Sequence, residues 1–134
     1  MNGQLEAKVS PYKASCLVHR AVFVIGAETT DIINVGVTLK DALSQVPGGR
    51  AGVFAYLSDD ANGDTVTGTT PTSVAIGTNG LAIAMVAGKA WQITTEADGT
   101  FDLNIQYTGG AATYYLAIRM PDGRLVVSDA ITFA

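Results

Sequence analysis

The sequence has 134 residues, of which 48% are hydrophobic and 15% are charged, and its formal net charge is −4. A chain of this length and apolar content can bury one core of its own, which excludes disorder along most of the chain. The acidic balance makes nucleic acid a poor partner, because phosphate binding needs a basic stripe, and no segment approaches the ~18 apolar residues of a membrane span.

The first 20 residues, MNGQLEAKVSPYKASCLVHR, show no sustained hydrophobic period of either the helical or the strand kind. They carry three basic side chains and one acidic side chain, which gives +2, whereas residues 21–134 carry five basic and eleven acidic side chains, which gives −6. We interpret residues 1–20 as an extended arm that becomes ordered on a partner. The alternative is a frayed terminus or a first strand of the sheet.

From residue 21 onward the chain has the pattern of short strands separated by turns. The clearest strand is TFDLNIQY (100–107), where apolar and polar side chains alternate so that one face is buried and the other is wet. Only LKDALSQ (39–45) could be helical, and it is too short to form a stable helix alone. Six further segments are strand candidates: DIINVGVTLK (31–40), AGVFAYLS (51–58), LAIAMVA (81–87), AWQITTE (90–96), ATYYLAIRM (112–120) and RLVVSDAITFA (124–134).

Four Asn-Gly or Asp-Gly pairs fall between these apolar runs and predict hairpin turns, because both residue types tolerate the positive φ that tight turns require. Seven or more short strands at this spacing predict an antiparallel sandwich or barrel. In the last run, Asp129 would share the face of Val127 and Ile131, which predicts a β-bulge at Ser128-Asp129; the alternative is that Asp129 forms a hydrogen bond at a rim of the sandwich. The four turn pairs are Asn62-Gly63, Asn79-Gly80, Asp98-Gly99 and Asp122-Gly123.

The stretch LSDDANGDTVTG (57–68) places four acceptor side chains within six positions. An EF-hand loop that started at Asp60 would need Gly at its sixth position and Glu at its twelfth, but Thr65 and Pro71 occupy them. Asp59 and Asp60 can instead accept hydrogen bonds from nearby backbone N–H groups. We therefore predict a structural loop without a metal ion; a calcium site is the alternative.

The sequence contains few residues in arrangements that could catalyse a reaction. His19 and Cys16 are the only residues of their types, and no partner motif accompanies either, so we expect no catalytic residue, no cofactor and no metal. A single cysteine and the absence of an apolar signal segment at the start fit synthesis in a reducing cytoplasm. Trp91 and the Tyr114-Tyr115 pair are expected to anchor the core or an interface; a sugar-stacking platform is the alternative.

The segment ATYYLAIR (112–119) resembles the F strand of immunoglobulin-type domains, with Leu116 at the position of the usual cysteine. The longer stretch LNIQYTGGAATYY (103–115) is similar to the E strand, the E–F corner and the start of F. This resemblance implies an antiparallel immunoglobulin-like β-sandwich without the disulfide, in which Leu116 points into the core.

At the level of the whole chain, residues 21–134 resemble small immunoglobulin-like or similar β-sandwich virion proteins of tailed bacteriophages. The most distinctive motifs are AYLSDDANGD (55–64) and PDGRLVVSDAITFA (121–134). The resemblance implies a capsid decoration or cement protein, made in the host cytoplasm, which sits on the outer capsid surface and binds the major capsid protein. It implies no catalytic residue. A dimer or trimer on the capsid would match the local symmetry axes of the lattice.

The expected organisation is thus an all-β sandwich over 21–134, preceded by a capsid-binding arm over 1–20. Nucleic acid and membranes are not expected partners. A glycan-binding or host-surface-binding module and a tail or baseplate component are the alternative functions, since sandwiches of this kind host many functions. The candidate capsid contacts are Lys8, Tyr12, Lys13, His19 and Arg20.

Overall fold

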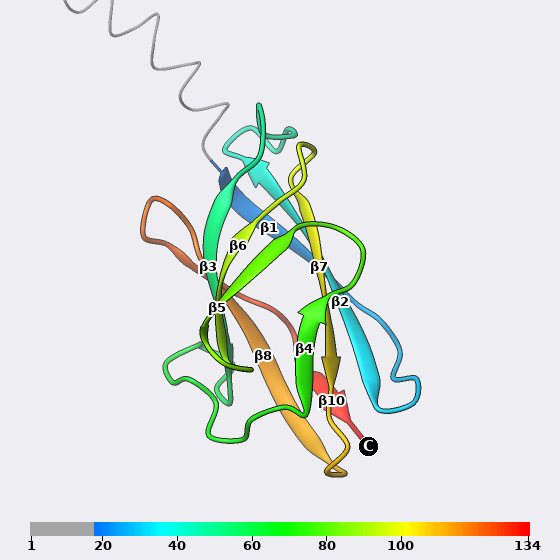
Figure 1. Cartoon of the computed structure of the whole chain (residues 1–134). Helices are drawn as coiled ribbons and strands as arrows, with labels where there is room; N and C mark the ends of the chain where they lie inside the picture. Colours follow the sequence, from blue (N-terminus) through cyan, green and yellow to red (C-terminus); the bar gives the residue numbers. More distant parts are fainter. Residues whose placement is uncertain (1–17) are drawn as a thin grey trace, which may run out of the picture.

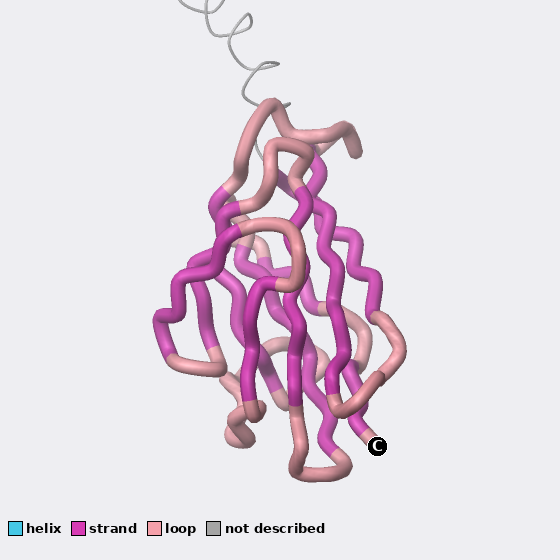
Figure 2. The backbone as a smooth tube through the Cα atoms, turned by 45° about the vertical axis from the view of Figure 1, so that its right-hand side comes forward, coloured by secondary structure: helices cyan, strands magenta, loops and turns pink. Residues whose placement is uncertain are grey.

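The computed structural model describes residues 18–134, and this part of the chain is all-β, as predicted. Its strands form two antiparallel sheets that pack as a β-sandwich, with loops gathered at the two ends (Figures 1 and 2). The segment 39–45 is not helical: β2 ends at Asp41 and turns follow it. Among the described residues, no helix is long and apolar enough to cross a membrane.

The first sheet has four strands in the order β1-β2-β7-β4. β2 and β7 are its central strands, and every second residue of each is buried, as the sequence alternation predicted. The bounds are β1 Val18–Ile25, β2 Ile32–Asp41, β7 Thr100–Gln106 and β4 Ser73–Ile76.

The second sheet has the order β10-β8-β3-β6-β5, and the short strand β9 pairs with β8 beside β10. β3 and β8 lie at its centre and β5 forms one edge. The bounds are β3 Gly52–Ser58, β5 Leu81–Val86, β6 Ala90–Thr94, β8 Ala112–Arg119, β9 Leu125–Val127 and β10 Ile131–Phe133.

The core fills the space between the two sheets with the inward side chains of both. Leu116 is fully buried, as the resemblance to an F strand implied, and Trp91 is only 3% exposed. At one end of the core, the rings of Tyr107, Tyr114 and Phe133 meet edge to face, with centroids about 6 Å apart. Such pairs add to the burial of apolar area that drives folding.

The strand order matches the centre of an immunoglobulin-type sandwich and departs from it at one edge. β2 pairs with β7 in one sheet and β3 pairs with β8 in the other, as strands B and E and strands C and F do. In variable-type domains the extra edge hairpin precedes the strand that pairs with E. Here β4 comes first, and the β5–β6 hairpin follows it.

The glycines of all four predicted turn pairs have positive φ, but only Asp122-Gly123 joins two strands that pair with each other, β8 and β9. The other three pairs lie in connections that cross from one sheet to the other. Their assignment to hairpins was wrong, because a positive φ reverses the chain locally without deciding which sheet the next strand joins.

The predicted bulge at Ser128-Asp129 is confirmed. Ala117 lies opposite Val127 in the β8–β9 pair, whereas Tyr114 lies opposite Ile131 in the β8–β10 pair, so one extra residue separates the two registers. Ser128 replaces part of the lost ladder, because its hydroxyl oxygen accepts a hydrogen bond from the Leu116 N–H at 2.9 Å.

β1 begins at Val18, three residues before the predicted domain boundary at residue 21. Its register with β2 shifts between Val18 and Arg20, which makes His19 an extra residue in the strand. His19 and Arg20 are therefore strand residues and do not belong to an arm. The rest of the predicted arm, residues 1–17, lies outside the described part of the chain.

Candidate attachment surface

Of the five predicted contact residues, His19 and Arg20 lie in the described structure, at the start of the edge strand β1. Arg20 is exposed and lies directly opposite Lys40 of β2. The pairing of the two strands thus places two basic side chains next to each other. Lys8, Tyr12 and Lys13 lie outside the described residues.

Arg124, in the β8–β9 hairpin of the other sheet, reaches across the sandwich edge to His19. Its guanidinium donates a hydrogen bond to the His19 carbonyl oxygen at 3.2 Å and also contacts Nε2 of the imidazole. Nδ1 of His19 lies 3.3 Å from a carboxylate oxygen of Asp122. Both ring contacts are satisfied when Nδ1 carries the proton and donates it to Asp122, while Nε2 accepts from Arg124.

These side chains border an open hollow of about 390 Å³ between β1 and the β8–β9 hairpin, which we call the basic hollow. The ion pair of Arg50 with Glu96 and the contact of His19 with Asp122 are the salt-bridge contacts within residues 18–134, and neither includes Arg20, Lys40 or Arg124. Guanidinium groups bind carboxylates and phosphates through paired N–H donors, so the hollow suits an acidic group of a partner. Its lining residues are His19, Arg20, Ala21, Arg124 and Val126.

A second open hollow, of about 360 Å³, lies on the outer face of the first sheet beside Asp102. The Asp102 carboxylate accepts hydrogen bonds from Nδ2 of Asn34 at 2.8 Å and from the backbone N–H groups of Thr78 and Asn79 at 2.9 and 2.6 Å. Burial raises the pKa of this carboxyl, but the bonds from Asn79, Asn34 and Thr78 outweigh burial, so its pKa lies below the usual value. Asp102 therefore acts as a structural tie for the β4–β5 connection.

The acidic loop that follows β3 is held by its own side chains, as predicted. Asp59 accepts hydrogen bonds from the Thr67 hydroxyl and the Gly68 N–H, and Asp60 accepts one from the Asn62 N–H at 2.8 Å. The backbone bond from Gly68 is the main reason that the pKa of Asp59 is lowered. No group of three or more His, Cys, Asp or Glu side chains that could hold a metal ion occurs among residues 18–134.

The middle of this loop covers part of the outer face of the second sheet. The Tyr56 hydroxyl donates a hydrogen bond to the Gly63 carbonyl oxygen. Gly63 has a φ of 73°, and a Cβ atom there would lie only 3.0 Å from the side chains of Leu125 and Val127. A glycine is thus needed both for the backbone conformation and for the close approach, which gives the sequence pair Asn62-Gly63 a structural role.

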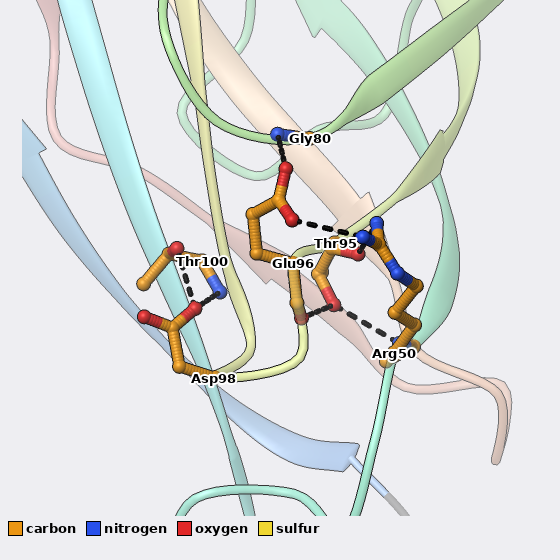
Figure 3. A network of polar contacts seen from close by, with 7 residues as sticks. Arg50, Gly80, Thr95, Glu96, Asp98 and Thr100 are labelled. Atoms are coloured by element: carbon orange, nitrogen blue, oxygen red, sulfur yellow. Dashed lines mark hydrogen bonds and ion pairs between the residues drawn. The ribbon is translucent and has the colours of Figure 1, made fainter.

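Three loops near the start of β1 are joined by a polar network around Glu96 (Figure 3). The Glu96 carboxylate accepts a hydrogen bond from the Gly80 N–H at 3.0 Å and pairs with the Arg50 guanidinium at 3.1 Å. Thr95 adds a bond from the Ala51 N–H to its hydroxyl oxygen at 2.9 Å. The network fixes the β2–β3, β4–β5 and β6–β7 connections to one another, so this end of the sandwich presents a defined surface.

Trp91 is buried between the sheets and Tyr114 is fully buried, so neither can stack on a sugar. Both are core residues, as the first of the two sequence interpretations held. Tyr115 faces outward and is half-buried. Sequence analysis did not identify Arg124 and Lys40, because only strand pairing and the β8–β9 hairpin bring them next to His19 and Arg20.

No family model matches this sequence, and no match to it occurs among curated proteins. A functional inference therefore rests on the geometry described above, together with the expectation from the sequence that residues 21–134 resemble phage virion proteins. The geometry points to a binding surface, because the exposed Arg20 and Arg124 border an open hollow at the edge of the sandwich.

Proposed function

We propose that this protein is a structural protein of a tailed-bacteriophage virion, a decoration or cement protein that binds the major capsid protein on the outside of the head. The observation that carries the proposal is the basic hollow. It places Arg20 and Arg124, neither of which forms an ion pair within residues 18–134, side by side on an acidic protein, and it lies at the first described strand, which the basic segment 1–17 directly precedes in the sequence.

Charge is distributed unevenly along the sandwich, and this supports attachment through one end. The end at which β1 starts carries the basic side chains of Arg20, Lys40, Arg50, Arg119 and Arg124 and the acidic side chains of Asp41, Glu96, Asp98 and Asp122, so it is not acidic overall. The opposite end, formed by the loops 26–31 and 59–72, carries five acidic side chains, and we call it the acidic end. A field of this kind orients a protein as it approaches an acidic surface. The five acidic residues are Glu28, Asp31, Asp59, Asp60 and Asp64.

The stabilisation of the head follows from mass action. A protein that binds the assembled lattice and not its separated subunits stabilises the lattice by its binding free energy. Many copies with modest interfaces would together resist the internal pressure of packaged DNA. A tightly packed sandwich with a fixed surface suits this task, because little conformational entropy is lost on binding.

The proposal is tested with heads that lack the protein. We expect the double variant Arg20→Ala with Arg124→Ala to bind at least about tenfold more weakly than the intact chain, because charge-assisted hydrogen bonds contribute roughly 1.5–3 kcal/mol each. Rising salt should weaken binding of the intact chain, since exposed charges are screened. Lys89→Ala, which removes a basic side chain from the β5–β6 turn, is the matched control and should bind normally.

A chain that starts at Val18 measures the contribution of the preceding segment, and it retains all of β1. We expect it to fold and to lose affinity for the heads. Normal, salt-insensitive decoration by both the arginine variant and the shortened chain would contradict attachment through this end. A copy number near the handful of a tail, instead of the hundreds of a capsid lattice, would contradict the decoration role itself.

A further inference from the structure

β5 forms a free edge of the second sheet and is the most exposed apolar strand of residues 18–134. It pairs with β6 on one side, and no described strand pairs with its other side. Leu81, Ile83 and Met85 are 56%, 57% and 62% exposed. An exposed strand edge offers a row of backbone N–H and C=O groups that another strand can complete.

The other sheet edges carry features that discourage such pairing. β1 has an exposed Arg20 and an extra residue at His19. β10 is only three residues long and begins just after the Ser128-Asp129 bulge. β4 begins two residues after Pro71, which has no backbone N–H to donate. On β5 the register irregularity at Met85 leaves Leu81 to Ala84 regular, a stretch of about 13 Å at ~3.3 Å per residue. That stretch has no charge and no proline, and no loop within residues 18–134 bonds to it.

The side chains of β5 fit a second copy of the same strand. Residues 77–88 contain no charged side chain, so two copies that meet in antiparallel orientation place no like charges opposite each other. Leu81 and Ile83 lie opposite Thr94 and Gln92 of β6 on the outer face, and the small Ala82 lies opposite the buried Ile93 on the inner face. The apolar outer row would thus lie beside the same row of the second copy, on one face of the joined sheet.

We propose that two copies of this protein associate through antiparallel β5–β5 pairing about a twofold axis, which joins their second sheets into one continuous sheet. The interface is isologous and closes at two copies. Because its regular part is short, the dimer is weak in solution. On a surface that holds many copies close together, high local concentration would favour it. The inference does not depend on what that surface is.

The test is sedimentation equilibrium of the full chain between ~1 µM and 1 mM, a range that covers weak interfaces. We expect a monomer–dimer equilibrium for the intact protein and at least tenfold weaker association for Ile83→Lys. Mixing Ile83→Lys with Ile83→Glu should restore dimers, because opposite charges then meet across the twofold axis. Val24→Lys, at a 67% exposed position on β1 of the other sheet, is the matched control and should dimerise normally.

Circular dichroism confirms that each variant is folded before it is compared. An intact protein that stays monomeric throughout this range would overturn the inference, as would a trimer, or a dimer that Ile83→Lys leaves unchanged. Because no phage head is present in the experiment, these outcomes leave the proposed attachment to the capsid untouched.

Discussion

Tyr114 is a buried residue with two opposite effects on the stability of the core. Its side chain is fully buried, and its ring packs edge to face against Tyr107 and Phe133. The hydroxyl has no hydrogen-bond partner among the described residues. Burial, with smaller effects of Tyr107 and Asp59, raises the pKa of Tyr114 to about 12. The ring therefore stabilises the fold while the unpaired hydroxyl costs free energy.

We expect Tyr114→Phe to raise the free energy of unfolding by about 0.5–2 kcal/mol, because it keeps the ring and removes an unpaired polar group whose burial costs roughly 1–3 kcal/mol. Chemical denaturation measures the change. Leu116→Ala, two residues along the same strand, is the reference and should lower stability by about 2–5 kcal/mol through the cavity it leaves. A loss of stability in Tyr114→Phe would show that the hydroxyl is well bonded.

At the scale of elements, the sequence predicted every strand except β1 and β4, and it predicted the connections between strands poorly. Alternation in 100–107 and 31–40 predicted β7 and β2 because their inner faces are fully buried, and the polar Asp129 among apolar residues revealed the bulge. Asn79-Gly80 and Asp98-Gly99 were assigned to hairpins although they cross between the sheets. Local φ preferences specify a reversal, whereas pairing depends on contacts far apart in the sequence.

The same distinction explains what sequence analysis found of the candidate surface. His19 and Arg20 were identified by their charge, but their strand was missed, because the extra residue at His19 interrupts the period of two. Arg124 is separated from His19 by 105 positions, and nothing in the local pattern relates the two residues. The charges of these side chains could be recognised in the sequence. The hollow that the side chains border exists only in the folded protein, because β1 and the β8–β9 hairpin form it together.

The β4–β5 connection illustrates how one side chain can hold an element in place. We expect Asp102→Ala to lower the free energy of unfolding at pH 7 by about 1–3 kcal/mol, since the N–H groups of Thr78 and Asn79 lose their acceptor. Chemical denaturation of both proteins across pH measures this. Asp129→Ala, whose carboxylate is exposed and accepts no hydrogen bond from residues 18–134, is the control and should change stability little.

The pH dependence of that difference has a definite sign. The pKa of Asp102 is lower in the folded protein than its usual value of 3.8, so the stabilisation is complete above the unfolded pKa and is lost as pH falls through the folded pKa. The gap between wild type and Asp102→Ala should be constant above about pH 5 and narrow below 3.8. A gap that widens in acid would contradict the role assigned to the carboxylate.

At the scale of the whole molecule, charge and chain direction define two different ends. β1 starts at one end, beside the basic hollow and the loops tied together by Glu96. The chain finishes at the acidic end, where the Ala134 N–H donates a hydrogen bond to the Glu28 carboxylate at 2.9 Å (Figure 1). If the basic hollow faces an acidic capsid surface, the acidic end and the C-terminus point outward.

This orientation predicts where the protein tolerates added mass. A peptide tag after Ala134 should leave decoration of heads unchanged and should bind antibody on intact particles, because it would extend from the acidic end. The same tag inserted after Leu43, which is 67% exposed in the β2–β3 loop at the opposite end, should prevent attachment by steric exclusion. Melting temperatures of the free proteins serve as the control for folding. The opposite result would be a folded C-terminal fusion that fails to attach and a Leu43 insertion that decorates heads normally. It would show that the protein binds the capsid through its acidic end.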